Sequence, residues 1–371
     1  MYSKRMVPVM LLCMVITAAF HRCKPRETHT NGTTTEATTT TATSATAREI
    51  TVLSYGGEFA AAQRAAYFDP FEKETGIRVK DVPYNGEYGK LKGVIQSGNV
   101  TWDVIDIEAS ALIRGMADNL YEPVDYGVVD KTDLIPQAVH THGVATDFYS
   151  VSLGWNTKSI AADRAPRSWS DFWNAQRFPG ARSMKKDPRF TLEIALLADG
   201  VPPSEIYKNG RLDVDRAFRS LDKIKKHVKV WWTTGQQPIQ LLSQGEVVMV
   251  AAFGARIWNA QHKDNLPVST TWVQDIIDTE YWAVPRGAKN RDAAMRFIAF
   301  ASRADRQAEF AKQIPLGPVN RKAFEHLPAD FAKDLNTHPD NLQNQVFLNS
   351  EWWAANEAAV SERFNKWLGA Q

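Results

Sequence analysis

From residue 49 onward, the hydrophobic and polar positions follow two periods in turn. Short runs of continuous or alternating apolar residues predict strands at 49–55, 77–84 and 102–108. After each run, apolar residues recur every three or four positions, which predicts helices at 58–75, 86–98 and 110–119. This alternation is typical of a mostly parallel sheet with helices on both faces.

A second α/β region follows a longer extended run at 146–157, which is rich in β-branched and aromatic residues. Its pattern predicts strands at 228–234 and 246–254, the latter fully apolar and therefore buried. A further extended stretch lies at 279–287. The same pattern predicts helices at 168–175 (capped by Ser168 or Ser170), 190–200, 213–228, 238–245, 292–314 (one long helix or two) and 351–369.

These two α/β units predict a two-lobed protein in which the chain crosses near 150–156 and returns near 280–286. We expect a first lobe of residues 49–152 with 281–316, and a second of 153–280 with 317–371. Ligands of open α/β sheets bind outside the carboxyl ends of the strands, so a cleft between the lobes is the expected site.

The N-terminal segment is expected to lie outside the fold. Basic residues and a short apolar stretch in 1–22 predict a secretory signal peptide, and the Thr-rich segment 23–48 predicts a disordered tether. Cys23 raises the question of a lipid anchor, against which His21 and Arg22 count, because small residues usually precede a lipidated cysteine. We expect an exported, periplasmic protein without an internal disulfide.

Composition and motifs favour binding over catalysis. A formal net charge of +2 gives no reason to expect a nucleic-acid partner, and 12 tryptophans offer flat apolar walls for a ligand. No metal-ligand spacing, nucleophile elbow, Walker loop or dinucleotide fingerprint occurs in the sequence. We therefore expect a protein that is not an enzyme and needs neither cofactor nor metal.

Gly56 and Gly57 lie where the first predicted strand passes into a helix. Two interpretations stay open: a tight turn, or a ligand seat where bare backbone and the first helical amides meet the cleft. The second interpretation makes the surrounding residues candidates for the site: Ser54, Tyr55, Gly56, Gly57 and Glu58.

The segments "ITVLSYGGEF", "QLLSQGEVVM", "EYWAVPRGAKNRDAAMRFIAF" and "IPLGPVNRKAF" occur in an order and spacing that resemble a known family. That family is the extracellular solute-binding proteins of bacterial ABC importers, and the similarity is greatest to its spermidine/putrescine-binding group. The resemblance covers nearly all of 49–370. It implies a two-lobed periplasmic-binding-protein fold of type II that closes on a polyamine and passes it to membrane permease subunits.

The resemblance also implies site residues. Aromatic rings and carboxylates that hold a polyamine correspond here to Phe59, Glu108 to Ser110, Asp187, Phe253, Asp278, Glu280, Trp352 and Trp353. Two expected groups are missing, because an aromatic position falls at Gly56 and an acidic one at Phe190. Each candidate also has a structural interpretation: Asp187 could start a turn, and Phe253 could belong to the core.

The ligand therefore has two alternatives. The first is a polyamine such as spermidine or putrescine, or a related organic amine. The second is a carboxylate-bearing or zwitterionic molecule held on the Gly56 and Gly57 amides with help from Arg256. In either case we expect a monomer that transports its ligand by lobe closure.

Overall fold

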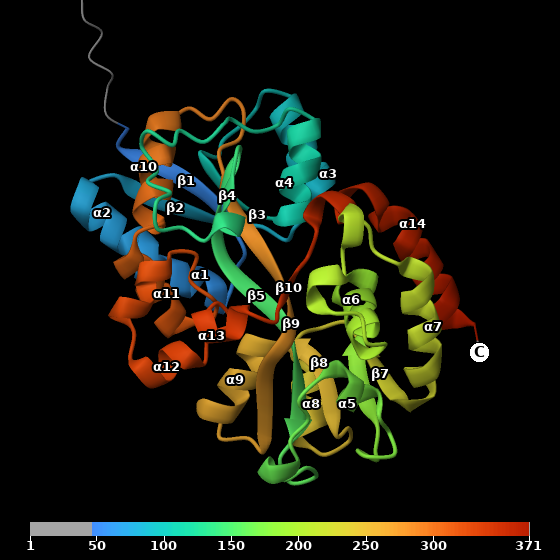
Figure 1. Ribbon diagram of the computed structural model, residues 1–371. Coiled ribbons are helices and arrows are strands. Elements are labelled where there is room, and N and C mark those ends of the chain that lie inside the picture. Colours follow the sequence, from blue (N-terminus) through green and yellow to red (C-terminus); the bar gives the residue numbers. More distant parts are fainter. Residues whose placement is uncertain (1–46, 371) are drawn as a thin grey trace, which may run out of the picture. The chain divides into compact units, whose positions relative to one another are not determined.

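The computed structural model describes residues 47–370 (Figure 1). The expected signal peptide, Cys23 and nearly all of the expected tether lie outside these residues. Within 47–370, no helix is long and apolar enough to cross a membrane.

One sheet connects the strands of the described residues. Its order is β2-β1-β3-β9-β5-β8-β6-β7, with β4 paired to β5 and β10 paired to β9. Pairing is parallel at both ends, and antiparallel from β3 through β9 and β5 to β8. The strands are β1 (Glu49–Ser54), β2 (Arg78–Pro83), β3 (Val104–Glu108), β4 (Val139–His140), β5 (Gly143–Asn156), β6 (Arg182–Lys185), β7 (Val228–Trp232), β8 (Met249–Phe253), β9 (Val268–Ala283) and β10 (Val346–Phe347).

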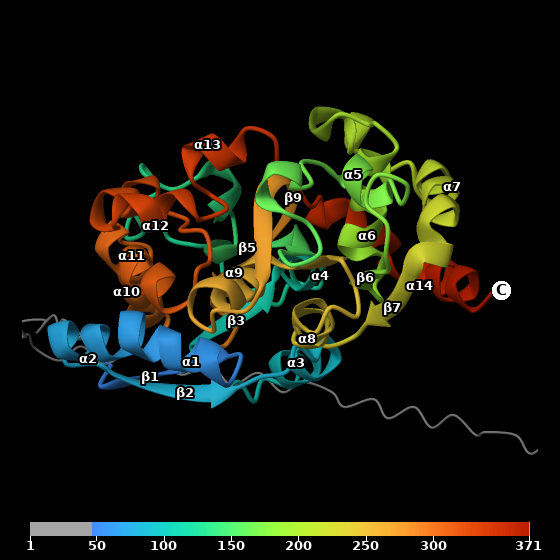
Figure 2. The same ribbon diagram turned by 90° about the horizontal axis from the view of Figure 1, so that it is seen from below.

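The helices pack around this sheet (Figures 1 and 2). They are α1 (Glu58–Gln63), α2 (Asp69–Thr75), α3 (Tyr88–Gln96), α4 (Ala109–Ala117), α5 (Trp169–Trp173), α6 (Pro188–Ala198), α7 (Val214–Ile224), α8 (Gln237–Ser243), α9 (Gly254–His262), α10 (Arg291–Ala301), α11 (Ala304–Gln313), α12 (Ala329–Lys333), α13 (Pro339–Leu342) and α14 (Ser350–Gly369).

Two hydrophobic cores divide the described residues into lobes. The first core contains residues from Ile50 to Phe148 and from Ile277 to Val319. The second contains residues from Val151 to Ile276 and from Val346 to Phe364. The core changes between Phe148 and Val151 on β5 and between Ile276 and Ile277 on β9, so these two long strands join the lobes. The change on β5 lies at the beginning of the expected 150–156, and the change on β9 lies before the expected 280–286.

A third passage of the chain also differs from expectation. The segment 317–335 was expected in the second lobe, but Ala323, Leu327 and Leu335 pack with Ala308 and Ala311 of α11 beside the first lobe. The chain returns to the second core only at Val346. The reason is that α11 has an apolar stripe that needs cover, and the next segment provides it.

Local sequence explains several element ends. Gly76 ends the helical stretch 58–75 in the left-handed conformation, as its sequence predicts. That stretch contains a π-helical turn, Arg64–Phe68, between α1 and α2. Ser168, rather than Ser170, caps α5 by accepting a hydrogen bond from the Asp171 amide.

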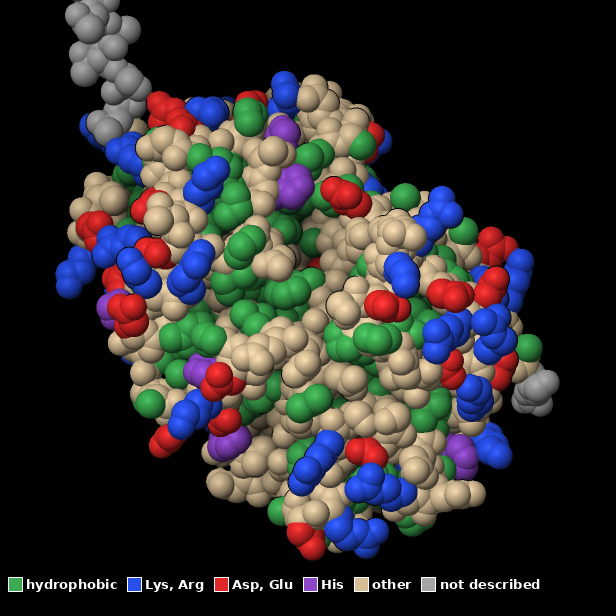
Figure 3. All heavy atoms as spheres, viewed as in Figure 1, with side chains coloured by type: hydrophobic (Ala, Val, Ile, Leu, Met, Phe, Trp, Pro, Cys, Tyr) green, Lys and Arg blue, Asp and Glu red, His purple; other side chains and the backbone are tan. Residues whose placement is uncertain are grey.

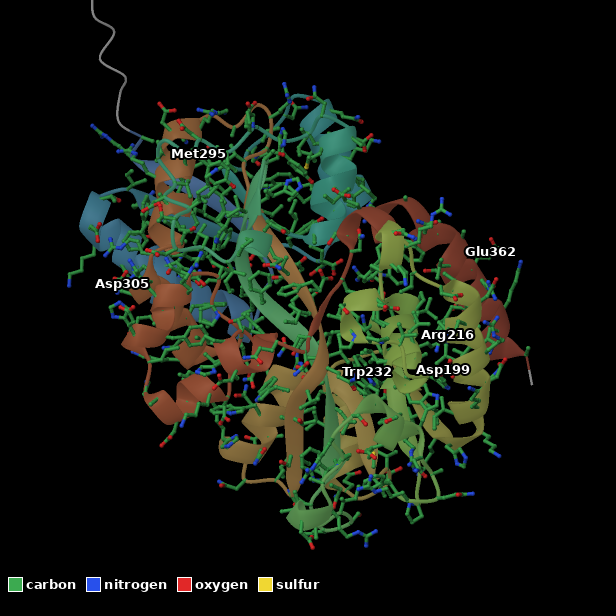
Figure 4. All side chains as sticks on the ribbon, in the orientation of Figure 1. Asp199, Arg216, Trp232, Met295, Asp305 and Glu362 are labelled. Atoms are coloured by element: carbon green, nitrogen blue, oxygen red, sulfur yellow. The ribbon has the colours of Figure 1, made fainter. Side chains whose placement is uncertain are left out.

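Salt bridges fasten the outer helices of the second lobe. Arg216 of α7 donates through Nε to Asp199 at 2.8 Å, which ties α7 to the end of α6 (Figure 4). Charged side chains of both signs are spread over the visible face of the molecule (Figure 3).

Candidate functional site

A cavity of about 1000 Å³ lies between the two lobes. The first lobe contributes the start of α1 and the strand ends of β3 and β9, and the second contributes α6, α8 and α9. In Figure 2 these helices lie near the centre of the view. The lining residues used below are Gly56, Gly57, Glu58, Phe59, Glu108, Asp147, Tyr149, Ser150, Lys185, Arg189, Phe190, Gln236, Phe253, Arg256, Asn259, Ala260, Lys263, Asp264, Glu280 and Gln313.

Strand register places three carboxylates in one row on the wall of the first lobe. Glu280 of β9 pairs with Glu108 of β3 on one side and with Asp147 of β5 on the other. All three line the cavity. Like charges at directly opposed strand positions repel each other, so this arrangement is stable only with protons or a cation close by.

Burial acts on this row in the same direction. It raises the pKa of Asp147 to about 7, and burial with the neighbouring acids raises the pKa of Glu280 well above its usual range. Asp147 Oδ1 and Glu280 Oε2 are buried and have no hydrogen-bond partner among the described residues. These two oxygens are therefore free to accept hydrogen bonds from a cationic donor.

A fourth acid, Asp106, lies on β3 two residues before Glu108. Asp106 is fully buried, and it accepts hydrogen bonds from Gln63 Nε2 at 2.7 Å and from the Ser54 hydroxyl at 3.2 Å. The same Ser54 hydroxyl lies 2.6 Å from Gln63 Oε1, so its single proton is shared between the two acceptors. Ser54 therefore organises Asp106 and does not line the cavity.

The opposite wall is basic. Arg189, at the start of α6, pairs with Glu108 across the cleft at 3.1 Å. Burial lowers the pKa of Arg189, but Glu108, Tyr149, Asp278 and Asp187 together outweigh burial and raise it, so the guanidinium stays charged. Phe190 has a φ of 69°, which is a strained conformation for a residue with a bulky side chain. This kink separates Arg189 from the regular turns of α6.

Lys185 is the second cation of this wall. Its Nζ contacts Asp187 at 2.8 Å and lies 4.9 Å from the centre of the Phe190 ring and 5.8 Å from that of Phe253. The Phe253 ring also packs against Trp232, with ring centres 5.5 Å apart. The rings of Phe190 and Phe253 thus already face a cation of the protein itself, the ammonium group of Lys185.

Asp187 does not line the cavity. Its carboxylate caps α6 by accepting a hydrogen bond from the Arg189 amide at 2.9 Å. Burial would raise its pKa, but Lys185 and Arg189 hold that pKa below the usual range. The structural interpretation of Asp187 as a turn former is the one that this geometry supports, with a second role in holding Lys185.

Gly56 and Gly57 line the cavity and differ in what they require. Gly57 has a φ of 69°, so its conformation favours glycine, and nothing lies within 4 Å of an added Cβ. Gly56 has an ordinary φ, and an added Cβ would meet only Pro83 at 3.9 Å. Tyr55 is not part of the cavity lining and packs against Phe59 and Tyr84.

Four other candidates lie outside the cavity lining. Asp278 is buried and accepts a hydrogen bond from the Tyr149 hydroxyl at 3.0 Å, and burial raises its pKa to about 6. Ser110 is buried in α4. Trp353 is buried in the second core, where it donates to Glu193, and Trp352 packs against it. The two tryptophans belong to the packing of α14.

Sequence reasoning missed Asp147, Tyr149, Lys185 and Arg189. An acid inside the aromatic and β-branched run 146–157 was a usable signal for Asp147, because strand interiors disfavour Asp. Lys185 and Arg189 could have been suspected from the charged run before Phe190, which interrupts an otherwise apolar segment.

Two α/β lobes joined by long strands around a charged cavity define a ligand-binding protein of the two-lobed type II class. Residues 66–339 match the family of bacterial extracellular solute-binding proteins. The chain belongs to that family.

Relatives with known names refine the comparison. A gamma-aminobutyric acid-binding protein from Pseudomonas aeruginosa is 40% identical over 325 residues, which cover 86% of this chain and 91% of that protein. The spermidine/putrescine-binding periplasmic protein of Escherichia coli is 23% identical over 303 residues, covering 76% and 81%. The polyamine-binding proteins are therefore distant relatives, although the sequence resemblance was expected to be greatest to their group.

A solved structure supports the same comparison. A structure of a gamma-aminobutyric acid (GABA) receptor is similar to this chain, with a TM-score of 0.78 and 35% sequence identity. The similarity covers 87% of this chain and 98% of the receptor chain. The family and its neighbours establish a periplasmic or extracellular solute-binding protein that works with an ABC importer.

Proposed function

We propose that this protein binds a zwitterionic ω-amino acid of the gamma-aminobutyrate kind and delivers it to the permease of an ABC importer. The observation that carries the proposal is the separation of charge across one cavity. A row of carboxylates lies on the first lobe, and Arg189 and Lys185 lie on the second.

The ammonium end of the ligand belongs at the acidic row. Glu280 and Asp147 each have a buried oxygen without a partner, and an ammonium group has three donors. A charge-assisted hydrogen bond to both acids removes the repulsion between them. This contact is available only to a ligand that carries an amine.

The carboxylate end belongs at Arg189 and Lys185. Both are already charged and held in place, Arg189 by Glu108 and Lys185 by Asp187. Arg189 Nε is buried and has no hydrogen-bond partner among the described residues, so one N–H donor of the guanidinium is unused. Gly56 and Gly57 line the same cavity and are the second candidate seat for this carboxylate.

A polyamine is the second candidate ligand, favoured by the acidic row and by the distant polyamine-binding relatives. Lys185 argues against it, because its ammonium already faces Phe190 and Phe253. A second ligand amine at this wall would meet two cations and no unpaired acid. We therefore rank the zwitterion first.

The test is a thermal-shift panel of four matched ligands on the mature protein. Gamma-aminobutyrate carries both charged ends, butyrate lacks the amine, aminobutane lacks the carboxylate, and putrescine has an amine at both ends. A ligand that binds only the folded state raises the melting temperature. We expect a clear rise with gamma-aminobutyrate and little change with the other three.

The panel separates the candidates by which compounds are active. A rise with putrescine and none with gamma-aminobutyrate would replace the zwitterion by the polyamine. A rise with butyrate as large as that with gamma-aminobutyrate would remove the acidic row from the site. Binding without chemical change of the ligand is part of the proposal, and recovery of intact ligand after incubation checks it.

A further inference from the structure

We infer that the ligand carries a second anionic group on a branch beside its carboxylate, and that Arg256 binds this group. The inference rests on the proposed function and narrows its ligand class to an amino acid with two acidic groups. It is drawn from the size of the cavity, the charges of α9 and the packing of Arg256.

The cavity is larger than a plain ω-amino acid requires. Its volume of about 1000 Å³ is at the upper end of the range, roughly 300–1,000 Å³, that holds drug-sized ligands. An ammonium at the acidic row and a carboxylate at Arg189 and Lys185 occupy only the part lined by those residues, which we call the inner part. The remaining part, lined by residues of α8 and α9, is the outer part.

One face of α9 lines this outer part. Arg256, Asn259, Ala260 and Lys263 contribute to the lining, and their spacing of three and four residues places them on one side of a helix. This face is therefore a polar strip that continues the basic wall of the second lobe.

Among the cavity-lining cations, Arg256 and Lys263 form no ion pair within the described residues, and Arg256 has the longer hydrogen bond of the two. Lys185 and Arg189 each pair with an acid. Lys263 donates to the Gln313 carbonyl at 3.2 Å and is followed by Asp264, which also lines the cavity. Arg256 forms no ion pair within residues 47–370, and its only side-chain hydrogen bond is a long one of 3.4 Å to Gln236.

Arg256 is exposed, and one side of its side chain packs against Gly235. A Cβ added to Gly235 would lie 2.8 Å from Arg256 Nε and 3.2 Å from the Phe253 ring, so the guanidinium lies against the bare backbone of Gly235. Lys185 flanks the same Phe253 ring. Arg256 and Lys185 thus both lie near the Phe253 ring, and the inferred branch would extend from Lys185 toward Arg256.

A planar guanidinium favours a carboxylate, which it binds through two parallel hydrogen bonds. Glu58, on the opposite wall, also lines the outer cavity and would favour a cationic branch instead. The uncompensated guanidinium, which lies with Lys185 near the Phe253 ring, favours the anion. The sign of the branch is therefore the quantity to test.

The experiment measures the affinity of two ligands that differ only in this sign. One is gamma-aminobutyrate with a carboxymethyl branch beside its carboxylate, and the other has a carbamoylmethyl branch of the same shape. Both are titrated calorimetrically into the wild type, Arg256→Gln, Glu58→Gln and Lys226→Gln, an exposed lysine that does not line the cavity. The unbranched gamma-aminobutyrate serves as reference ligand.

We expect the wild type to bind the carboxymethyl ligand at least tenfold more tightly than the carbamoylmethyl ligand. Arg256→Gln should remove this preference, so that both branched ligands bind equally, whereas Lys226→Gln and Glu58→Gln should keep it. Equal affinities in the wild type, or a preference that survives Arg256→Gln, overturn the inference. Failure of all three ligands to bind overturns the proposed function, and the inference with it.

Discussion

Glu108, Glu280 and Asp147 occupy strand positions where three carboxylates are costly together, and this cost is the clearest functional feature at the scale of single residues. Glu280 and Glu108 were expected at the site, whereas Asp147 was not. The sequence shows each acid, but only strand register shows that they are opposed. Lys185 and Arg189 were missed for a similar reason, because their role depends on a kink at Phe190 that periodicity does not reveal.

Glu280→Gln removes one partner of the ligand ammonium. Hydrogen bonds to charged groups contribute about 1.5–3 kcal/mol, so we expect gamma-aminobutyrate affinity to fall roughly 10- to 100-fold. Thermal stability should not fall, because one like charge leaves the acidic row. Glu362→Gln on the outer face of α14 is the control for loss of a carboxylate (Figure 4). Unchanged affinity in Glu280→Gln would remove this residue from the site.

Lys185→Leu tests the selection against amines. Without the ammonium, Phe190 and Phe253 are open to a ligand amine, so putrescine affinity should rise while gamma-aminobutyrate affinity falls about tenfold. Thermal-shift titrations measure both. Lys186→Leu, at the exposed neighbouring residue, should change neither. If the affinities for putrescine and gamma-aminobutyrate both fell in Lys185→Leu, Lys185 would not discriminate between the two ligands.

At the scale of elements, the two strands that join the lobes carry an unusual acid. Asp275 of β9 is fully buried and accepts hydrogen bonds from the Ser150 and Ser152 hydroxyls of β5, and its Oδ1 has no partner within the described residues. Burial raises its pKa to about 8. Gln274, directly before it, has a φ of 61°, so the crossing strand is irregular at this point.

The raised pKa of Asp275 predicts a loss of stability with rising pH. The folded state holds this proton more tightly than the unfolded state, so stability falls from about pH 4 to pH 8 as the unfolded carboxyl ionises first. Asp275→Asn carries no such charge and should be more stable than the wild type at pH 8, with a smaller difference at pH 5. Urea unfolding at both values measures this, with exposed Asp163→Asn as control. An equal difference at both values would contradict it.

Most elements were predictable from the sequence because their apolar stripes are regular, as in 58–75 and 213–228. Two elements of the second lobe were not. β6 is masked by the charged residues around it, since only Arg182–Lys185 forms the strand. α9 follows β8 with no turn signal between them, because Gly254 serves as the first residue of the helix. The crossing on β9 lies before its predicted position. The reason is that β9 begins at Val268, well before the apolar stretch that marks its end.

At the scale of the whole described region, contacts outside the cavity hold the lobes together. Trp258 of α9 donates through Nε1 to Asp334 at 3.0 Å, and its ring packs against Phe331 of α12. Because α9 belongs to the second lobe and α12 packs beside the first, this contact spans the cleft. It is expected to favour the closed arrangement that retains ligand.

Asp334→Ala should therefore weaken ligand binding without touching the cavity. Loss of one hydrogen bond of about 1 kcal/mol predicts an affinity several-fold lower. We expect the change to appear in the dissociation rate, measured by stopped flow, because most affinity changes of related complexes lie in that rate. Asp330→Ala on the same helix is exposed and should leave the rate unchanged. Equal rates in Asp334→Ala and wild type would show that the contact does not hold the lobes.

The central claim is that the carboxylate row of Glu108, Glu280 and Asp147 receives the ammonium of a zwitterionic ligand. Isothermal titration of gamma-aminobutyrate near pH 6.5, in two buffers with different ionisation enthalpies, tests it most directly. Asp147 has a pKa of about 7 and Glu280 a raised one, so an ammonium that favours their charged forms must displace protons. We expect saturable binding with net proton release and tighter binding at pH 8 than at pH 6. Binding without proton release, or binding of putrescine but not of gamma-aminobutyrate, would contradict it.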